Sequence, residues 1–335
     1  MTIIEAIACS FPTRSVTNAE LKQDYPDWDF ERLEKRTGVL SRYVAAENET
    51  ALDFARRACA QLDQQGKLRA PEIDALIFCT QSPDHIMPPN SCILHGELGL
   101  RPDVFAFDIT LACSGYIYGM QLADSLIRSG SAKRVLLATA DTYTRYIHPG
   151  DRATRCLFGD GGAVSIIAAS PGTRGIRDIR CGTAGAQYQK FIIPAGGMRV
   201  PRSPETAKET LDSSGNVRSA EHIKMDGFGV LSFFNATVPV SVNETLARNR
   251  LSLADVDLFV FHQASQIVLD TLRTAMKIPV EKMVIDLAET GNLVSASIPV
   301  ALSRAFDRGQ AKPGQLALLC GFGVGLSWGT ALVDL

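Results

Sequence analysis

Short runs of hydrophobic residues alternate along the chain with longer segments whose hydrophobic residues recur at helical spacing. The strand-length runs cover residues 75–80, 104–109, 134–140, 163–169, 258–261, 283–287, 315–320 and 330–333. The helical segments cover residues 51–64, 114–129, 238–249, 265–276 and 295–308. Strands that alternate with helices predict an α/β fold with mixed sheets. Several of the runs are hydrophobic without interruption, which favours strands covered on both faces.

Two of the helical segments, residues 114–129 and 295–308, are rich in Ala, Gly and Ser for much of their length. Such helices are typical of the middle of a layered structure. Residues 172–175 form a turn cluster near the midpoint of the chain, and residues 194–221 are rich in Pro, Gly, Ser and charge. We therefore expect two halves and, in the second, a long excursion outside the core.

Composition and charge exclude several classes of protein. The chain has 335 residues, 46% of them hydrophobic, which allows a substantial core. A net charge of −2 gives no basic field that would favour nucleic acid. No hydrophobic stretch is long enough to cross a membrane, and Glu5 interrupts the hydrophobic N-terminus, which indicates a strand instead of a signal peptide. We expect a cytoplasmic protein that binds neither nucleic acid nor membrane.

Cys113 lies where the strand pattern of residues 104–109 changes into a helical pattern that starts at Ser114. The free N–H groups and the macrodipole of a helix N-terminus favour the thiolate over the thiol, and the thiolate is the nucleophile. Gly115 has no side chain, so we expect it to let a substrate approach the backbone. By itself, Cys113 fits a small buried hydrophobic residue equally well. The seven other cysteines are scattered without a CxxC pair, which argues against a structural zinc site or a disulfide framework.

Two further polar residues follow hydrophobic strands or turns. His262 comes directly after residues 258–261, where it can serve as a general base or as a donor to an oxyanion. Asn292 follows Gly291 in a turn and carries an amide that can donate a hydrogen bond. Taken alone, His262 is more simply a packed core histidine and Asn292 a residue of an ordinary turn.

A glycine-rich segment, GFGVGLSWG at residues 321–329, lies between two of the strand-length runs. Its alternating glycines allow backbone N–H groups to approach a substrate oxygen, as an oxyanion hole requires. It lacks the GxGxxG spacing of a dinucleotide site. The segment FGDGGA at residues 158–163 is most simply a tight turn that leads into the next strand.

These features occur along the chain in the order Cys, His, Asn and glycine-rich strand end. In this order, the combination is specific for one protein family. The sequence resembles the β-ketoacyl-acyl carrier protein synthase III family of the thiolase superfamily from end to end. The matching segments are RTGVLSR (36–42), SPDHxxP (82–88), ACSGYIYG (112–119), FGDGGA (158–163), HQAS (262–265), GNLVSASIP (291–299) and GFGVGLSWG (321–329).

The resemblance implies a five-layered αβαβα sandwich of two similar halves, residues 1–172 and 173–335, and a homodimer. The first half would supply the nucleophile and the second half the His and Asn. The substrates it implies are an acyl thioester and a malonyl thioester, each carried by coenzyme A or by acyl carrier protein. No metal or redox cofactor is implied.

The resemblance also implies a role for each motif residue. Cys113 would attack the acyl thioester and hold the acyl group, while the backbone N–H groups of Cys113 and Val324 stabilise the oxyanion. Many relatives have Gly where this chain has Val324. A malonyl thioester would then lose CO2, with His262 and Asn292 donating to the enolate oxygen, and the carbanion would attack the acyl group to give a 3-oxoacyl thioester.

Several positions that bind substrate or coenzyme A in the family depart from its pattern here. The resemblance places Arg36, Arg152, Arg32, Phe228 and Ile267 at such positions. Arg152 matches a family Arg, whereas Arg32, Ile267 and Phe228 replace a family Trp, Arg and Asn. We therefore expect a specialised relative whose acyl donor is longer, aromatic or carrier-bound, working in secondary metabolism or a specialised lipid pathway. His85, Ile86 and Met87 are candidates for the lining of the acyl tunnel, which depends on dimer packing.

Two other functions stay open beside decarboxylative condensation. In the first, the chain passes the acyl group from Cys113 to an oxygen, nitrogen or sulfur nucleophile; retention of His262 and Asn292 favours condensation. In the second, it is a non-catalytic subunit, although such subunits commonly lose the Cys. A thiol protease with the same three residue types is excluded by the family match more than by the triad.

Overall fold

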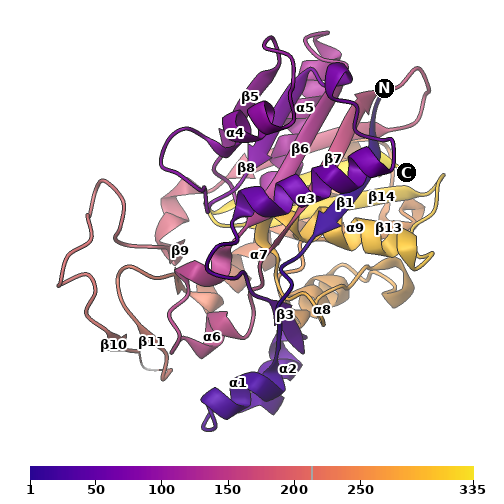
Figure 1. Ribbon diagram of the computed structural model, residues 1–335. Coiled ribbons are helices and arrows are strands. Elements are labelled where there is room, and N and C mark those ends of the chain that lie inside the picture. The colour runs from indigo at the N-terminus through magenta and orange to yellow at the C-terminus, as the bar shows by residue number, and fades with distance from the viewer. Residues whose placement is uncertain (213) are drawn as a thin grey trace.

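A five-stranded and a four-stranded β-sheet form the inner layers of the computed structural model, which describes residues 1–212 and 214–335 (Figure 1). The five-stranded sheet has the order β1-β7-β6-β4-β5. Strand β4 pairs in parallel with β5 and β6, and β7 is antiparallel to β1 and β6. Its strands are β1 (Thr2–Ser10), β4 (Ala75–Cys79), β5 (Phe105–Ile109), β6 (Arg134–Asp141) and β7 (Gly161–Ala169).

The four-stranded sheet has the order β13-β14-β15-β8. Strand β13 pairs in parallel with β14, and the other neighbours are antiparallel. Its strands are β8 (Ile176–Thr183), β13 (Leu258–Phe261), β14 (Leu316–Gly323) and β15 (Ser327–Asp334). The division of the chain at residues 172 and 173 stays a prediction.

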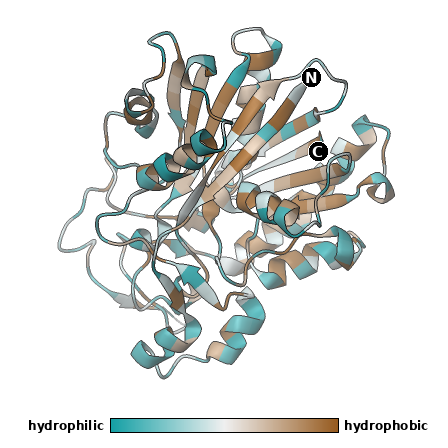
Figure 2. Ribbon diagram, turned by 45° about the vertical axis from the view of Figure 1, so that its right-hand side comes forward, coloured by the Kyte–Doolittle hydropathy of each residue, from teal (hydrophilic) through white to brown (hydrophobic). Residues whose placement is uncertain are grey.

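Three pairs of helices complete the layers. Helices α3 and α4 cover the outer face of the five-stranded sheet, α5 and α9 lie between the sheets and contact both, and α7 packs on the four-stranded sheet beside α8. Hydrophobic residues follow the strands and the helix faces turned toward them (Figure 2). This arrangement confirms the predicted αβαβα sandwich. The helices are α3 (Ala51–Gln64), α4 (Asn90–Glu97), α5 (Gly115–Arg128), α7 (Gly227–Arg248), α8 (Gln266–Ala275) and α9 (Ser297–Asp307).

Smaller elements extend from one end of the sandwich (Figure 1). They are β2 (Ser15–Thr17), α1 (Asn18–Asp24), α2 (Phe30–Thr37), β3 (Ser41–Tyr43), α6 (Arg152–Arg155), β9 (Phe191–Ile192), β10 (Thr210–Leu211), β11 (Val217–Arg218) and β12 (Lys224–Met225). The excursion predicted at residues 194–221 contains the β10–β11 hairpin. Among the described residues, no helix is both long enough and hydrophobic enough to cross a membrane.

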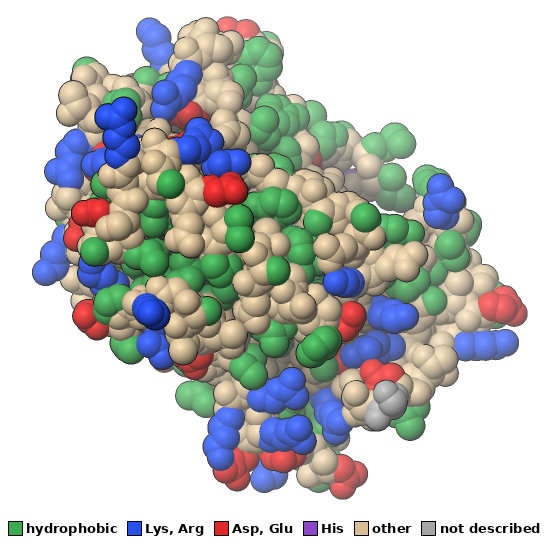
Figure 3. Space-filling model, turned by 180° about the vertical axis from the view of Figure 1, so that it is seen from behind, with side chains coloured by type: hydrophobic (Ala, Val, Ile, Leu, Met, Phe, Trp, Pro, Cys, Tyr) green, Lys and Arg blue, Asp and Glu red, His purple; other side chains and the backbone are tan. Residues whose placement is uncertain are grey.

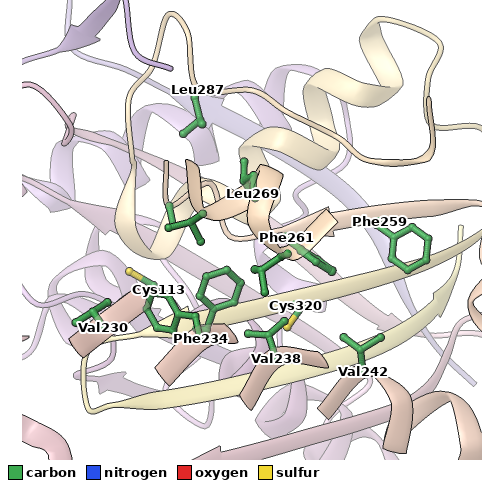
Figure 4. Packing of buried hydrophobic residues seen from close by; sticks show 14 of the residues in the cluster. Cys113, Val230, Phe234, Val238, Val242, Phe259, Phe261, Leu269, Leu287 and Cys320 are labelled. Carbon is green, nitrogen blue, oxygen red and sulfur yellow. The ribbon is translucent and has the colours of Figure 1, made fainter. Parts of the chain in front are cut away.

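The small residues of α5 allow the two sheets to share one helix layer. A Cβ atom at Gly119 would lie 2.5 Å from the end of the Leu137 side chain of β6, so a larger residue there would require Leu137 to move. On the other side of the four-stranded sheet, Phe259 and Phe261 pack with Phe234 and Val238 of α7 in one buried cluster (Figure 4). Cys113 belongs to the same cluster, which places the nucleophile candidate against the core.

The strand predicted at residues 283–287 is wrong, since this segment makes only one bridge, between Met283 and Phe259. The side chain of Gln263 takes the place of the missing ladder. Its Nε2 donates to the carbonyls of Phe261 (2.7 Å) and Val284 (3.3 Å), and its Oε1 accepts the N–H of Asp286 (2.7 Å). A side chain therefore satisfies backbone groups that a fifth strand would otherwise pair.

The helix predicted at residues 238–249 begins earlier, at Gly227, and ends at Arg248. It contains Pro239 near its middle and two glycines in its first turn, at positions 227 and 229, which local propensity disfavours. Asp226 caps the helix by accepting the Gly229 N–H (2.9 Å), and the following residues are held by burial of Val230, Phe233 and Phe234. Tertiary packing therefore overrides propensity here.

Replacing Gln263 by Leu should lower the free energy of unfolding by about 1–3 kcal/mol for each backbone group left buried and unpaired. Chemical denaturation monitored by far-UV circular dichroism measures this change. Gln121→Leu, at a partly buried position of α5 where the amide's one hydrogen bond among the described residues is to the Ser125 hydroxyl (3.3 Å), is the matched control and should change stability little. Equal stability of the Gln263 and Gln121 variants would show that the amide does not replace a strand.

Candidate active site

Cys113 is 4% exposed and lies between the end of β5 and the start of α5. Two glycines of β14 lie directly against it. A Cβ atom on Gly323 would be 2.5 Å from Cβ and 2.8 Å from Sγ of Cys113, and one on Gly321 would be 2.7 Å from the Cys113 carbonyl oxygen. These glycines therefore let the strand pack onto the nucleophile candidate, a close approach that any side chain would block.

Two backbone N–H groups, those of Cys113 and Val324, lie close enough to the thiol to stabilise a negative charge on it. Val324 follows β14 in the turn before β15, and Ser327 fixes this turn by donating to the Val324 carbonyl (2.8 Å). Ser327 is also hydrogen-bonded to Ser114, the residue after Cys113 (2.8 Å). The structure thus brings together the two donors that the sequence predicts for an oxyanion hole.

The expected thiolate at the helix N-terminus is wrong for the resting protein. Burial raises the pKa of Cys113 to about 12, and the nearby Asp141 carboxylate raises it further, although the two backbone N–H groups act in the opposite direction. Desolvation of a fully buried charge exceeds the effect of the helix end. Gly115 also differs from expectation: a side chain there would collide with Sγ of Cys79, so the glycine serves packing instead of substrate approach.

His262 lies directly after β13 and is 1% exposed. Burial lowers the pKa of His262 to about 3, so its imidazole is neutral. Its backbone N–H donates to the Cys320 carbonyl (2.7 Å), and Nδ1 lies 2.6 Å from Oγ of Ser297. The ring Nε2 lies 3.3 Å from Nδ2 of Asn292. The structure therefore brings together the predicted His and Asn, with Ser297 on the far side of the ring.

The amide of Asn292 has one defined orientation. Its Oδ1 accepts the N–H of Val294 (2.9 Å), so its Nδ2 faces His262. Val294 has φ of 53°, a left-handed conformation that costs a β-branched residue of order 1–3 kcal/mol. The next residue, Ser295, holds this turn by donating from Oγ (2.5 Å) and N (3.4 Å) to the buried Asp141 carboxylate.

Asp141, at the end of β6, links the five-stranded sheet to the turn that carries Asn292. It also accepts hydrogen bonds from the N–H of Gln81 (2.8 Å) and from the hydroxyls of Thr80 (3.3 Å) and Ser82 (3.4 Å). Burial raises the pKa of Asp141 to about 6, although the bonds from Ser295, Gln81 and Thr80 oppose the rise. A carboxylate of the five-stranded sheet therefore fixes the turn that orients Asn292.

The Cys113 thiol and the His262–Asn292 pair both lie at the end of β14. Gly323 lies against Cys113, and the ring of Phe322 packs edge-on against the His262 ring with centroids 5.6 Å apart. The FGDGGA turn joins the same place, since Phe158 bridges to Asn292. A side chain at Gly159 would collide with the Thr290 carbonyl, so this turn does more than lead into β7. Thiol, paired N–H donors, imidazole and amide form one buried site.

The predicted substrate-binding residues lie outside this buried site. Arg32 and Arg36 are exposed on α2, and Ile267 is 42% exposed at the start of α8. These two helices are neighbours, since a side chain at Gly38 would lie 2.8 Å from Gln266. Arg36 and Ile267 are therefore carried by adjoining elements.

Three further groups of predicted substrate-binding residues lie outside the buried site, in segments other than α2 and α8. Arg152 begins α6 and donates to the Ser214 carbonyl, and Phe228 at the start of α7 is 85% exposed. The loop that carries His85, Ile86 and Met87 is exposed, with Ile86 at 89% and Met87 at 79%. Within the described part of the chain, the loop does not line the cavity of about 360 Å³ beside Val324.

A cavity of about 360 Å³ opens beside the turn that carries Val324 and Gly325. Its wall includes the side chains of Tyr143, Tyr146, Phe191 and Ile223. Tyr143, Phe191 and Ile223 belong to the same hydrophobic cluster as Cys113. The buried site therefore adjoins a hydrophobic space that residue patterns did not predict.

Sequence patterns alone do not reveal four residues that hold the site together: Asp141, Ser295, Ser297 and Ser327. The sequence contains one indication of Asp141. This residue comes directly after the hydrophobic run at residues 134–140, just as His262 comes directly after the run at residues 258–261. Ser295 and Ser297 lie within the quoted motif GNLVSASIP, but their partners are more than 30 residues away in the chain. Only the fold reveals such contacts.

Comparisons with known proteins agree with this site. The family model "3-Oxoacyl-[acyl-carrier-protein (ACP)] synthase III" matches residues 107–185, and that of its C-terminal region matches residues 246–335. A beta-ketoacyl-[acyl-carrier-protein] synthase III of Campylobacter curvus (strain 525.92) is 37% identical over 98% of this chain and 95% of its own. The beta-ketoacyl-[acyl-carrier-protein] synthase III 3 of Streptomyces coelicolor (strain ATCC BAA-471 / A3(2) / M145) is also 37% identical, over 98% and 96%. A crystal structure of a 3-oxoacyl-(acyl-carrier-protein) synthase III has a TM-score of 0.97 and 41% identity, covering 100% of this chain and 99% of that chain.

The raised pKa of Cys113 predicts how its reactivity depends on pH. Alkylation of Cys113 by iodoacetamide should accelerate about tenfold per unit between pH 7 and pH 9, because the thiolate fraction grows in this proportion well below the pKa. Peptide mass spectrometry at timed intervals measures the rate at this position. Cys59, whose pKa burial also raises to about 12 but which is 0% exposed, should stay unmodified. A rate that levels off near pH 7 would contradict the raised pKa.

Proposed function

The chain belongs to the 3-oxoacyl-[acyl-carrier-protein] synthase III family, and we propose on this basis that it forms an acyl-Cys113 intermediate and condenses it with a malonyl thioester to give a 3-oxoacyl thioester. It is an acyltransferase of the condensing type. The observation that carries the proposal is one buried site that combines a thiol beside two backbone N–H groups with an imidazole–amide pair.

Acylation begins from a neutral thiol and a neutral imidazole. Because Nδ2 of Asn292 can only donate, its contact with Nε2 of His262 makes Nε2 the acceptor and places the ring proton on Nδ1. Nε2 accepts the proton of Cys113 as sulfur bonds to the acyl carbon. The bond from that carbon to the donor's sulfur then breaks, and the departing thiol takes the proton. The N–H groups of Cys113 and Val324 stabilise the oxyanion between these events.

Decarboxylation uses the same pair as donors. The bond between the malonyl carboxylate and its neighbouring carbon breaks, CO2 leaves, and the electron pair passes into an enolate. Nδ2 of Asn292 and Nε2 of His262 donate to the enolate oxygen, which requires the ring proton on Nε2. Ser297 allows both tautomers, because a hydroxyl can accept from Nδ1–H or donate to Nδ1. The carbanion attacks the acyl carbon and the bond to sulfur breaks, so Cys113 leaves as a thiolate. It takes one proton from solvent, which the overall condensation consumes.

Two features support condensation over transfer to an oxygen, nitrogen or sulfur nucleophile. Both His262 and Asn292 are present, and the Val294 N–H fixes the amide with its donor toward the imidazole. Acyl transfer to an oxygen, nitrogen or sulfur nucleophile does not require the Asn292 amide as a second donor beside His262. The intact set of Cys113, His262 and Asn292 also argues against a non-catalytic subunit.

We propose acyl and malonyl thioesters of coenzyme A or acyl carrier protein as substrates, with no metal or redox cofactor. Arg36 and Arg152 would contact the carrier at the mouth of the site, and Arg32, Phe228 and Ile267 would make contacts unlike those of the family pattern. Because Phe228 and Ile267 are exposed hydrophobic residues where the family pattern has polar ones, we propose a specialised pathway.

We also propose that the protein is a homodimer in the cytoplasm. Strand β5 is an edge strand in the described sheet and exposes 53% of Phe105, and the nearby loop exposes Ile86 and Met87. Hydrophobic side chains also gather across the middle of the face seen from behind (Figure 3). Because an unpaired edge and exposed hydrophobic side chains favour association, a second copy would let His85, Ile86 and Met87 line the acyl tunnel of its partner. The free cysteines fit a reducing compartment.

The acyl intermediate should be visible by intact-protein mass spectrometry. Incubation with a panel of acyl-coenzyme A and acyl-carrier-protein donors should add one acyl mass to the wild type and none to Cys113→Ala. A malonyl thioester should then remove the added mass with release of CO2. Cys92→Ala, an exposed cysteine, is the matched control and should load normally. Discharge by an alcohol or amine without CO2 would replace condensation with acyl transfer.

Replacing Asn292 by Ala should slow CO2 release about 10²–10³-fold, as loss of one oxyanion donor does, while acyl loading falls only a few-fold. Single-turnover measurements on the preloaded protein separate these steps. Asn249→Ala, at the end of α7, should leave both rates unchanged. An equal loss in loading and decarboxylation would mean that Asn292 supports the site as a whole instead of the enolate.

A further inference from the structure

We infer that the acyl donor carries a hydrophobic group of about six to ten non-hydrogen atoms, linear or aromatic, which occupies the 360 Å³ cavity beside Val324. This inference rests on the proposed function, because it concerns the group attached to Cys113. It adds the class of acyl group, which family membership leaves open.

The cavity lies beside the turn that carries one of the two oxyanion donors. Val324 and Gly325 form part of its wall, and the Val324 N–H is one of the two donors beside the Cys113 thiol. Tyr143 connects the wall to the rest of the site, since its ring packs against Phe158 with centroids 5.3 Å apart. An acyl group whose carbonyl oxygen rests between the two donors therefore has the cavity next to it.

The chemistry of the wall favours a group without polar atoms. Most of its side chains are rings or aliphatic chains, and none of the described residues that line it is charged. The wall residues with polar side chains are Gln81, Thr110, Tyr143, Tyr146 and Tyr188. The hydroxyls of Tyr143 and Tyr146 are already paired.

Tyr143 donates to Oε1 of Gln81 (2.8 Å), and Tyr146 donates to the Gln81 carbonyl (3.0 Å). With these hydroxyls engaged, the wall presents mostly rings and aliphatic carbons to the cavity, and Gln81 and Thr110 are its other polar side chains apart from Tyr188. A carboxylate or hydroxyl on the acyl group would lose its water and gain no partner from the rings and aliphatic carbons, which is unfavourable.

The volume sets the size of the group. An apolar cavity of about 150 Å³ is enough to hold benzene. This cavity is more than twice as large, so an acetyl group would leave most of it unfilled, whereas a hexanoyl, octanoyl or phenylacetyl group would contact its walls. Each methylene that a hydrophobic pocket can accommodate changes discrimination by about tenfold or more. Longer hydrophobic donors should therefore load faster than acetyl.

The experiment measures the rate at which each donor acylates Cys113, by intact-protein mass spectrometry. The donors are acetyl, hexanoyl, octanoyl, phenylacetyl and succinyl thioesters, presented on coenzyme A and, in parallel, on acyl carrier protein. Hexanoyl, octanoyl or phenylacetyl should load at least tenfold faster than acetyl, and succinyl no faster than acetyl. The comparison of octanoyl with phenylacetyl tells whether the natural group is linear or aromatic.

A variant that fills the cavity tests whether this space sets the preference. Ile193→Trp should lower the ratio of octanoyl to acetyl loading at least tenfold. Because Ile193 is only partly buried, the larger side chain can be accommodated without loss of the fold, and a thermal melt checks this. Val280→Trp places the same side chain at a position that is 65% exposed and outside the cavity wall, and it should leave the ratio unchanged.

The outcomes separate the inference from the proposed function. If no donor on either carrier acylates Cys113, the proposed function fails and the inference fails with it. If acetyl or succinyl loads as fast as octanoyl and phenylacetyl, the proposed function stands and the inference is overturned. A folded Ile193→Trp protein with an unchanged ratio would also overturn the inference.

Discussion

The contact between β14 and the start of α5 is the constraint on which the site depends. Gly321 and Gly323 lie so close to Cys113 that any side chain at either position would overlap it. Because β14 lies against the nucleophile, the turn that follows can aim the Val324 N–H at the thiol, and the strand beside it can deliver His262. The glycines therefore define the geometry of the donors as well as the packing of two layers.

Burial gives this site a neutral resting state. The raised pKa of Cys113 and the lowered pKa of His262 share one cause, the loss of water around a charged form. Burial also raises the pKa of Asp141, as it does for other buried acids. Several hydrogen-bond donors surround this carboxylate, and it anchors the turn that carries Asn292. The N–H groups are therefore already in position when a negative charge develops during the reaction. Preorganised dipoles of this kind are the most effective in catalysis.

Local patterns predicted the layers and the chemical groups well, and the long-range polar contacts poorly. The helix expected at residues 51–64 matches α3 at both ends, and the run at residues 258–261 is β13, because both have clear periodicity and ends. The start of α7 and the run at residues 283–287 were misjudged, since burial overrode propensity in one and the Gln263 side chain replaced a strand in the other.

The candidate residues themselves could be found from motifs, but their electrostatics could not. The pKa of Cys113 depends on how completely the second sheet covers it, which no local segment records. The partners Asp141–Ser295 and His262–Ser297 likewise join positions far apart in the chain. The cavity is formed by residues from several separate segments, so its volume becomes visible only in the fold.

The hydrogen bond between Ser114 and Ser327 spans 213 positions of the chain. During synthesis the N-terminal part emerges first, so Cys113 leaves the ribosome long before the β14–β15 pair that covers it. Until that pair docks, the thiol lacks the glycines that cover it and the Val324 N–H that faces it. The newly made chain is therefore more open to oxidation at this position than the finished protein, and docking of the last two strands both completes the oxyanion donors and protects the sulfur.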